Sequence, residues 1–107
     1  MLQTTIIHDL VSWIENHLEE PLNVKRVATK AGYSQWHLQR LFKNTTGDSL
    51  ATYIRKKRLQ NAASELKQSR KTIADIAYKY QFDSQQSFTR AFKKMYDKTP
   101  SDYRYRA

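Results

Sequence analysis

Apolar residues recur along the chain at intervals of three and four positions, which is the spacing of one face of an α-helix. No stretch alternates apolar and polar residues as a half-buried strand would, and only two Gly and two Pro interrupt the pattern. The sequence therefore predicts an all-α fold of about seven helices.

Three helices are expected before residue 48. The apolar stripe of the first helix, which we expect to close at residues 19–21, consists of Ile7, Leu10, Val11, Ile14 and Leu18. Asn23 is the expected N-cap of the second helix, and Gly32 is the left-handed residue that ends it. Ser34 is expected to cap the third, which ends at Gly47 and buries Leu38, Leu41 and Phe42. The second and third helices form a helix-turn-helix.

A longer amphipathic segment runs from Asp48 or Ser49 to about Lys67, and it predicts a helix of about 28 Å at 1.5 Å per residue. Thr72 is expected to cap a fifth helix and Asp83 or Ser84 a sixth, which turns Phe88, Ala91, Phe92 and Met95 inward. Thr99 and Pro100 open the last helix. We therefore expect a single domain over 1–107, with two helix-turn-helix subdomains at 1–48 and 68–107 joined by a long linker helix at 49–67.

The two subdomains are copies of one sequence pattern. Residues 27–28 match 76–77 at an offset of 49, and one extra residue in the second turn changes the offset to 50. At that offset, the first copy contributes Ser34, Gln35, Leu38, Arg40, Phe42, Lys43 and Tyr53. Their partners in the second copy are Ser84, Gln85, Phe88, Arg90, Phe92, Lys93 and Tyr103. The chain holds two helix-turn-helix units.

Each copy has a polar face opposite its apolar one. At about 100° per residue, the side of the third helix opposite Leu38 carries Trp36, Gln39, Arg40 and Lys43, and the corresponding side of the sixth carries Gln86, Thr89, Arg90 and Lys93. Arg can bond guanine, Gln can bond adenine, and Thr or an indole can pack on a thymine methyl, while a distal Lys suits a phosphate. A solvated surface would explain any one of these residues, but it poorly explains an exposed Trp36. The matched faces favour readers of double-stranded DNA.

Charge supports a polyanionic partner. Nineteen Lys and Arg against ten Asp and Glu give a net charge of +9. No Lys or Arg precedes Lys25, whereas Asp9, Glu15, Glu19 and Glu20 are acidic. We therefore expect the N-terminal segment to face away from the polyanion.

Other function classes find little support. The chain has no Cys, which excludes disulfides and Cys-ligated zinc, and His8, His17 and His37 lack metal-ligand spacing. It shows no Gly-rich phosphate loop and no nucleophile elbow, so we expect no catalysis, metal or cofactor. A signal peptide and an apolar run long enough for a membrane span are both missing from the sequence, which favours a cytoplasmic protein without a membrane partner.

The runs AGYSQWHLQRLF at 31–42, FDSQQSFTRAF at 82–92 and TPSDYR at 99–104 resemble the AraC/XylS family, most of all its MarA/SoxS/Rob branch. The resemblance covers essentially the whole chain and implies a seven-helix DNA-binding domain that activates transcription as a monomer on asymmetric promoter sites, through contacts with RNA polymerase. It implies base contacts at Trp36, Gln39, Arg40, Gln85, Gln86, Ser87, Thr89 and Arg90. The phosphate contacts it implies are Ser34, Lys43, Arg55, Ser84 and Tyr103, to which the outward face adds Lys93.

Two features depart from that family. Many members carry a separate effector-binding domain, for which 107 residues leave no room, so we expect no small-molecule effector domain here. Gln81 stands where the second unit usually has Gly, so we expect a strained turn.

Several alternatives stay open. The basic run at 55–58 is equally well explained as a solvated helix face. For Tyr53 and Tyr103 the residue type favours packing with a polar tip, and a phosphate bond is the alternative. Trp13 and Asn16, with Glu15, Glu19 and Glu20, could form a polymerase-facing surface, but Trp13 could equally belong to the core. The rival functions are a nonspecific architectural or RNA-binding protein and a protein-interaction module with acidic partners.

Overall fold

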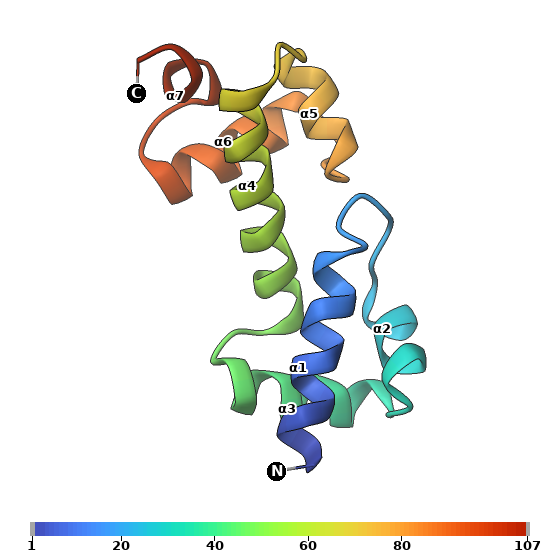
Figure 1. Cartoon of the computed structure of the whole chain (residues 1–107). Coiled ribbons are helices and arrows are strands. Elements are labelled where there is room, and N and C mark those ends of the chain that lie inside the picture. The colour runs from blue at the N-terminus through green and yellow to red at the C-terminus, as the bar shows by residue number, and fades with distance from the viewer. Residues whose placement is uncertain (1, 107) are drawn as a thin grey trace. The chain divides into compact units, whose positions relative to one another are not determined.

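The computed structural model describes residues 2–106, and it describes side chains from residue 5 onward. All regular structure in this range is helical, which confirms the predicted all-α fold (Figure 1). The seven helices are α1 (Leu2–Glu15), α2 (Val24–Ala31), α3 (Gln35–Thr46), α4 (Leu50–Gln68), α5 (Ile73–Lys79), α6 (Gln85–Tyr96) and α7 (Pro100–Arg106).

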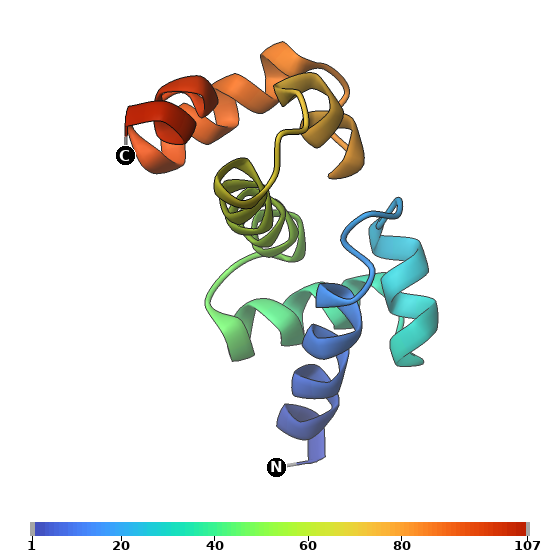
Figure 2. The same cartoon turned by 45° about the horizontal axis from the view of Figure 1, so that its top comes forward.

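The helices group into two compact units, Met1–Lys57 and Arg58–Ala107. In the first unit, α1, α2 and α3 all pack against one another (Figure 1). In the second, α5 packs on α6 and α6 on α7, as Figure 2 also shows. The long helix α4 belongs in part to each unit, because the boundary falls after Lys57.

Helix N-termini follow the predicted caps. In each, the side-chain oxygen of the residue before the helix accepts a hydrogen bond from the backbone N–H three positions on, which satisfies one of the unpaired donors of the first turn. These caps are Asn23, Ser34, Thr72 and Ser84. Thr99 does the same for α7 through the N–H of Asp102, at 3.1 Å.

The first unit closes its core around α3. Leu38 and Phe42 are fully buried, and the Phe42 ring meets that of Tyr53 edge-on at 5.3 Å between centroids. Leu18 is buried as predicted, but it lies outside α1, which ends at Glu15. The helix ends early because the Trp13 carbonyl accepts a hydrogen bond from the imidazole Nδ1 of His17 at 2.6 Å, and the backbone there turns to shorter-range hydrogen bonds.

The second unit is centred on aromatic residues of α6. Phe88 and Phe92 are fully buried, and the Phe92 ring also contacts Tyr96 and Tyr103. The inward orientation predicted for Met95 is wrong, since its side chain is 36% exposed. Tyr96, four residues after Phe92, continues the apolar side of the helix instead, and Met95 is turned toward solvent.

Two turns show how the copies differ. Gly32 and Gly47 end α2 and α3 with φ of +76° and +87°, conformations that glycine adopts without a steric penalty. The second unit places Gln81 and Asp97 at the matching positions, with φ of +68° and +59°. The strained turn expected at Gln81 is thus confirmed, and a second left-handed residue follows at Asp97.

Glu65 joins α4 to α5 within the second unit. Its side chain is 16% exposed and accepts hydrogen bonds from the Lys79 ammonium at 2.7 Å and the Tyr80 hydroxyl at 2.9 Å, and Lys71 lies 3.5 Å away. Burial acts to raise the pKa of Glu65, but the hydrogen bonds from Lys79 and Tyr80 and the two lysine charges outweigh it and lower the pKa. The ionised carboxylate therefore stabilises the fold.

The left-handed turn at Gln81 predicts a stability difference between two substitutions. Gln81→Gly and Gln81→Ala both lose the side chain beyond Cβ, but only glycine relieves the backbone strain. We expect the free energy of unfolding, measured by urea denaturation, to be roughly 0.5–1 kcal/mol higher for the Gln81→Gly variant than for the Gln81→Ala variant. Gly32→Ala is the matched control, because its Cβ would meet no atom within 4 Å, and it should destabilise. Equal stability of the two Gln81 variants would refute the strain.

The Glu65 hydrogen bonds predict a pH-dependent contribution to stability. The folded state lowers the pKa of Glu65 below the unfolded value of 4.5, so its stabilisation is present above that value and is lost as the pH falls through the folded pKa. Glu65→Gln should therefore lower the free energy of unfolding by roughly 1–3 kcal/mol at pH 7 and by less at pH 3. Asp83→Asn, at an exposed position of the same unit, is the control. A gap that stays constant with pH would contradict this assignment.

Candidate nucleic-acid interface

The outward face of α3 carries the polar residues that the periodicity predicted. Since Leu38 and Phe42 lie on the buried side, Trp36 is left 69% exposed, and Gln39, Arg40 and Lys43 are exposed with it. An indole this exposed contributes little to the core, so packing within the unit does not account for it.

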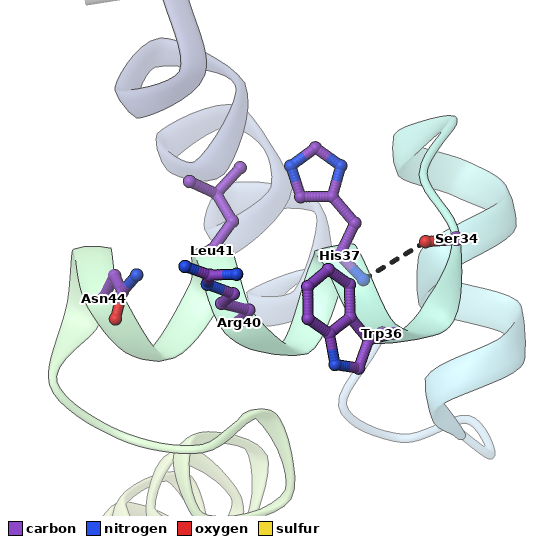
Figure 3. A pocket seen from close by; sticks show the side chains of 6 residues that line it. All are labelled: Ser34, Trp36, His37, Arg40, Leu41 and Asn44. Carbon is purple, nitrogen blue, oxygen red and sulfur yellow. Dashed lines mark hydrogen bonds between the residues drawn. The ribbon is translucent and has the colours of Figure 1, made fainter.

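Trp36 and Arg40 lie next to each other on this face, as Figure 3 shows. The guanidinium carbon of Arg40 is 5.3 Å from the centroid of the indole ring, within the range of a cation–π contact. Both side chains line two hollows of about 430 and 480 Å³, one of which extends toward Ser34 and the other toward Lys43. The pair therefore separates two depressions on the exposed side of α3.

The outward face of α6 is more polar. Gln85, Gln86, Arg90 and Lys93 are exposed, whereas Ser87 and Thr89 are half-buried. Where α3 has Trp36, α6 has Gln86, so the described residues place no aromatic ring over the guanidinium of Arg90.

The two N-cap serines differ in their free hydrogen-bonding capacity. Ser34 accepts the N–H of His37 at 3.2 Å and is exposed (Figure 3). Ser84 accepts the N–H of Ser87 at 3.0 Å and also donates its hydroxyl to the Ser87 Oγ at 3.1 Å. The hydroxyl proton of Ser84 is thus engaged within α6.

The equivalent tyrosines also have different surroundings. The Tyr53 hydroxyl donates to the Glu15 carboxylate at 3.0 Å, and burial together with this bond raises the pKa of Tyr53 to about 12. The Tyr103 ring contacts Phe92 and Tyr96, and the Lys67 ammonium lies 4.8 Å from its centroid. Both tyrosines pack, as the alternative interpretation held, and Tyr53 has its hydroxyl committed to a carboxylate.

The basic run on α4 does not form one uniform face. Lys56 pairs with Asp48 at 3.2 Å, and Arg58 is half-buried, where burial lowers the pKa of its guanidinium. Arg55 is exposed and forms no ion pair with the described residues. Of this run, Arg55 is thus free to contact a phosphate.

A second surface, which we call the Trp13 cluster, consists of Trp13, His17, Arg26 and Lys30. Trp13 is half-buried and stacks on the His17 ring at 4.3 Å, and Arg26 and Lys30 lie 5.4 and 5.9 Å from its centroid. A hollow of about 150 Å³ lies beside it. The sequence interpretation missed Arg26 and Lys30, because they reach Trp13 from a different helix and no local pattern connects them.

The acidic residues of the first segment are partly neutralised. Glu20 pairs with Arg26 at 2.8 Å, and this hydrogen bond lowers the pKa of Glu20. Glu15 accepts the Tyr53 hydroxyl. The surface around Trp13 is therefore mixed in charge, although the segment itself is acidic.

No helix within residues 2–106 has both the length and the apolar character needed to cross a bilayer. Nor do three His, Asp or Glu side chains of the described part of the chain gather as metal ligands.

The chain contains two helix-turn-helix units, and the second helix of each unit exposes a polar face. The fold and the site therefore place it among the helix-turn-helix proteins. A family described as "Helix-turn-helix domain" matches residues 27–106. The chain is 48% identical over 106 residues to the regulatory protein SoxS of Escherichia coli strain K12, covering 99% of each. It is 54% identical over 104 residues to the transcriptional regulator Rob of Salmonella typhimurium, covering 97% of this chain and 36% of Rob. The chain thus spans about a third of the length of that relative.

A solved structure agrees with these matches. An AraC-type transcriptional regulator from Chromobacterium violaceum is similar with a TM-score of 0.88 and 31% identity, over 94% of this chain and 89% of that one. The chain therefore belongs to the AraC-type family of helix-turn-helix transcriptional regulators, in the branch that includes SoxS and Rob. The resemblance drawn from the sequence is confirmed.

Proposed function

We propose that this protein binds double-stranded DNA in a sequence-specific manner as a monomer and activates transcription. In this proposal α3 and α6 are the recognition helices, and they enter successive major grooves of one asymmetric promoter site. One observation carries the proposal: both units expose an Arg, an amide or hydroxyl, and a distal Lys on the same side of the second helix of the motif. The names of SoxS and Rob, as regulators, support it.

The contacts that the family resemblance implies are carried over to the matching positions, whose residue types have suitable chemistry. We assign base contacts to Trp36, Gln39, Arg40, Gln85, Gln86, Ser87, Thr89 and Arg90. We assign phosphate contacts to Ser34, Lys43, Arg55, Ser84, Lys93 and Tyr103. In this assignment Ser84 redirects to a phosphate the hydroxyl proton that it donates to Ser87, and Tyr103 contributes its hydroxyl while its ring packs.

A chain with two recognition helices need not dimerise to read two half-sites. On one face of B-DNA, the two helices must bind about 34 Å apart. The 19 residues of α4 correspond to about 28 Å, a length of that order, which supports its role as the linker between two lobes at 1–48 and 68–107. Because Trp36 is matched by Gln86, and Gln39 by Thr89, the preferred site should lack two-fold symmetry.

Single substitutions on the two recognition helices separate this proposal from nonspecific backbone binding. Arg40→Ala and Arg90→Ala should each weaken binding to the preferred duplex by about 1–3 kcal/mol and relax selectivity at one base pair. Lys43→Ala is the matched control: it should weaken binding to every duplex and reduce the salt dependence by about one ion. The measurement is competition binding on a duplex selected from a random pool. Equal losses of affinity on all sequences would favour a nonspecific DNA- or RNA-binding protein. Failure to bind any duplex at low salt would favour a protein-interaction module.

We further propose that activation involves RNA polymerase and the Trp13 cluster, to which Asn16 and the acidic residues Glu15, Glu19 and Glu20 are adjacent in sequence. A half-exposed indole beside a hollow, flanked by charges of both signs, has the character of a protein-contact site. The side chain takes part in no base-reading face, so DNA binding and activation should be separable.

Trp13→Ala tests this separation. The variant should keep its DNA affinity but lower transcription by purified polymerase at least about fivefold, because an aromatic contact at an interface centre contributes more than 1 kcal/mol. The measurements are duplex binding and transcription from the same promoter fragment. A variant that binds DNA and activates fully would remove the Trp13 cluster from the activation mechanism.

A further inference from the structure

The exposed faces of α3 and α6 share one arginine position but differ in what stands four residues before it. Trp36 precedes Arg40, and Gln86 precedes Arg90, at the same helical spacing. Side chains on a helix lean toward its N-terminus, so the residue at i+4 lies over the one at i. The sequence of α3 therefore places a planar cation over an indole, and that of α6 places one over an amide.

The geometry of α3 agrees with a cation–π contact between the two side chains. The Arg40 guanidinium carbon lies 5.3 Å from the Trp36 ring centroid, and Figure 3 shows the two side chains together on one side of the helix. The indole is 69% exposed, so the apolar core does not hold it, and Arg40 supplies the cation over its ring. Hollows of about 430 and 480 Å³ lie beside the pair.

A long arginine side chain normally loses conformational freedom when it bonds a base, and this loss weakens binding. A guanidinium held against an aromatic ring has fewer conformations to lose, and its N–H donors, which lie in its own plane, stay available for a base. Arg90, with no ring over it among the described residues, receives no such help.

We propose that Trp36 is a positioning residue for Arg40: the indole holds the guanidinium in the orientation that bonds its base pair, so the first recognition helix discriminates that base pair more sharply than α6 discriminates the one facing Arg90. This inference rests on the proposed function, and it adds a specificity-determining contact between two side chains of the protein. Trp36 acts in this way in addition to any base contact of its own.

Two substitutions at position 36 separate positioning from simple apolar contact. Trp36→Leu keeps apolar bulk against a thymine methyl but removes the aromatic face, whereas Trp36→Phe keeps an aromatic face. Each is combined with Arg40→Ala, and the affinities of all variants are measured on the selected duplex and on duplexes changed at the base pair whose readout Arg40→Ala relaxes. Because Trp36 is exposed, all these variants should fold.

The expected result is coupling between the two positions. The loss of affinity caused by Arg40→Ala should be about threefold to thirtyfold smaller in the Trp36→Leu background than in the parent protein. In the Trp36→Phe background this loss should again approach that of the parent. Trp36→Leu alone should relax selectivity at the Arg40 base pair. On a duplex of unrelated sequence the coupling should vanish. The matched cycle in α6, Gln86→Leu with Arg90→Ala, should show independent effects.

Two other results overturn the inference and are distinguishable. If Arg40→Ala relaxes a base pair but its effect is the same in all three backgrounds, the proposed function stands and the positioning role of Trp36 is wrong. If Arg40→Ala changes neither affinity nor selectivity, both the inference and the base-reading role of Arg40 fail.

Discussion

The burial of two apolar side chains four residues apart on α3 and α6 is the constraint on which the interface depends. Leu38 and Phe42 in the first unit, and Phe88 and Phe92 in the second, have no exposed surface. Burying such side chains is worth about 2 kcal/mol each, so neither helix can rotate about its axis without a large loss. The side that faces solvent is thereby set, and the residues on it are left free for function.

The two units share a skeleton but not its details. Glycine ends α2 and α3 of the first unit in left-handed turns, and Gln81 and Asp97 take up that conformation in the second. Such a residue costs roughly 0.5–1 kcal/mol more than glycine in the same turn, which packing of the surrounding helices can offset. The exposed positions also differ, because the buried side chains of α3 and α6 do not restrict the residue type on the opposite side of the helix. Trp36 and Gln86 therefore occupy matching positions, and one motif presents two different chemistries.

Polar contacts hold parts of each unit together at its margins. Tyr53 bonds Glu15 in the first, and in the second Arg104 bonds the carbonyl of Leu66 at 2.8 Å, at the C-terminal end of α4. Unpaired carbonyls at a helix end favour a positive charge, so Arg104 both satisfies an acceptor and complements the helix dipole. The contact of Arg104 occupies a cation that the charge count alone would leave available for DNA.

Helix positions, caps and outward faces could be predicted from the sequence, because each depends on residues within one or two helical turns, and the repeat follows from comparing the sequence with itself. Ser34 caps its helix through a neighbour three positions away, and 3.6-residue periodicity places Arg40 opposite Leu38. The end of α1 at Glu15 reflects a local competition between the His17 ring and the backbone for the Trp13 carbonyl, which apolar periodicity does not record. The turn of Met95 toward solvent and the approach of Arg26 and Lys30 to Trp13 were decided only by the tertiary structure. They depend on which side chains of other segments compete for the same ring or apolar surface, and no periodicity within a single segment records that competition.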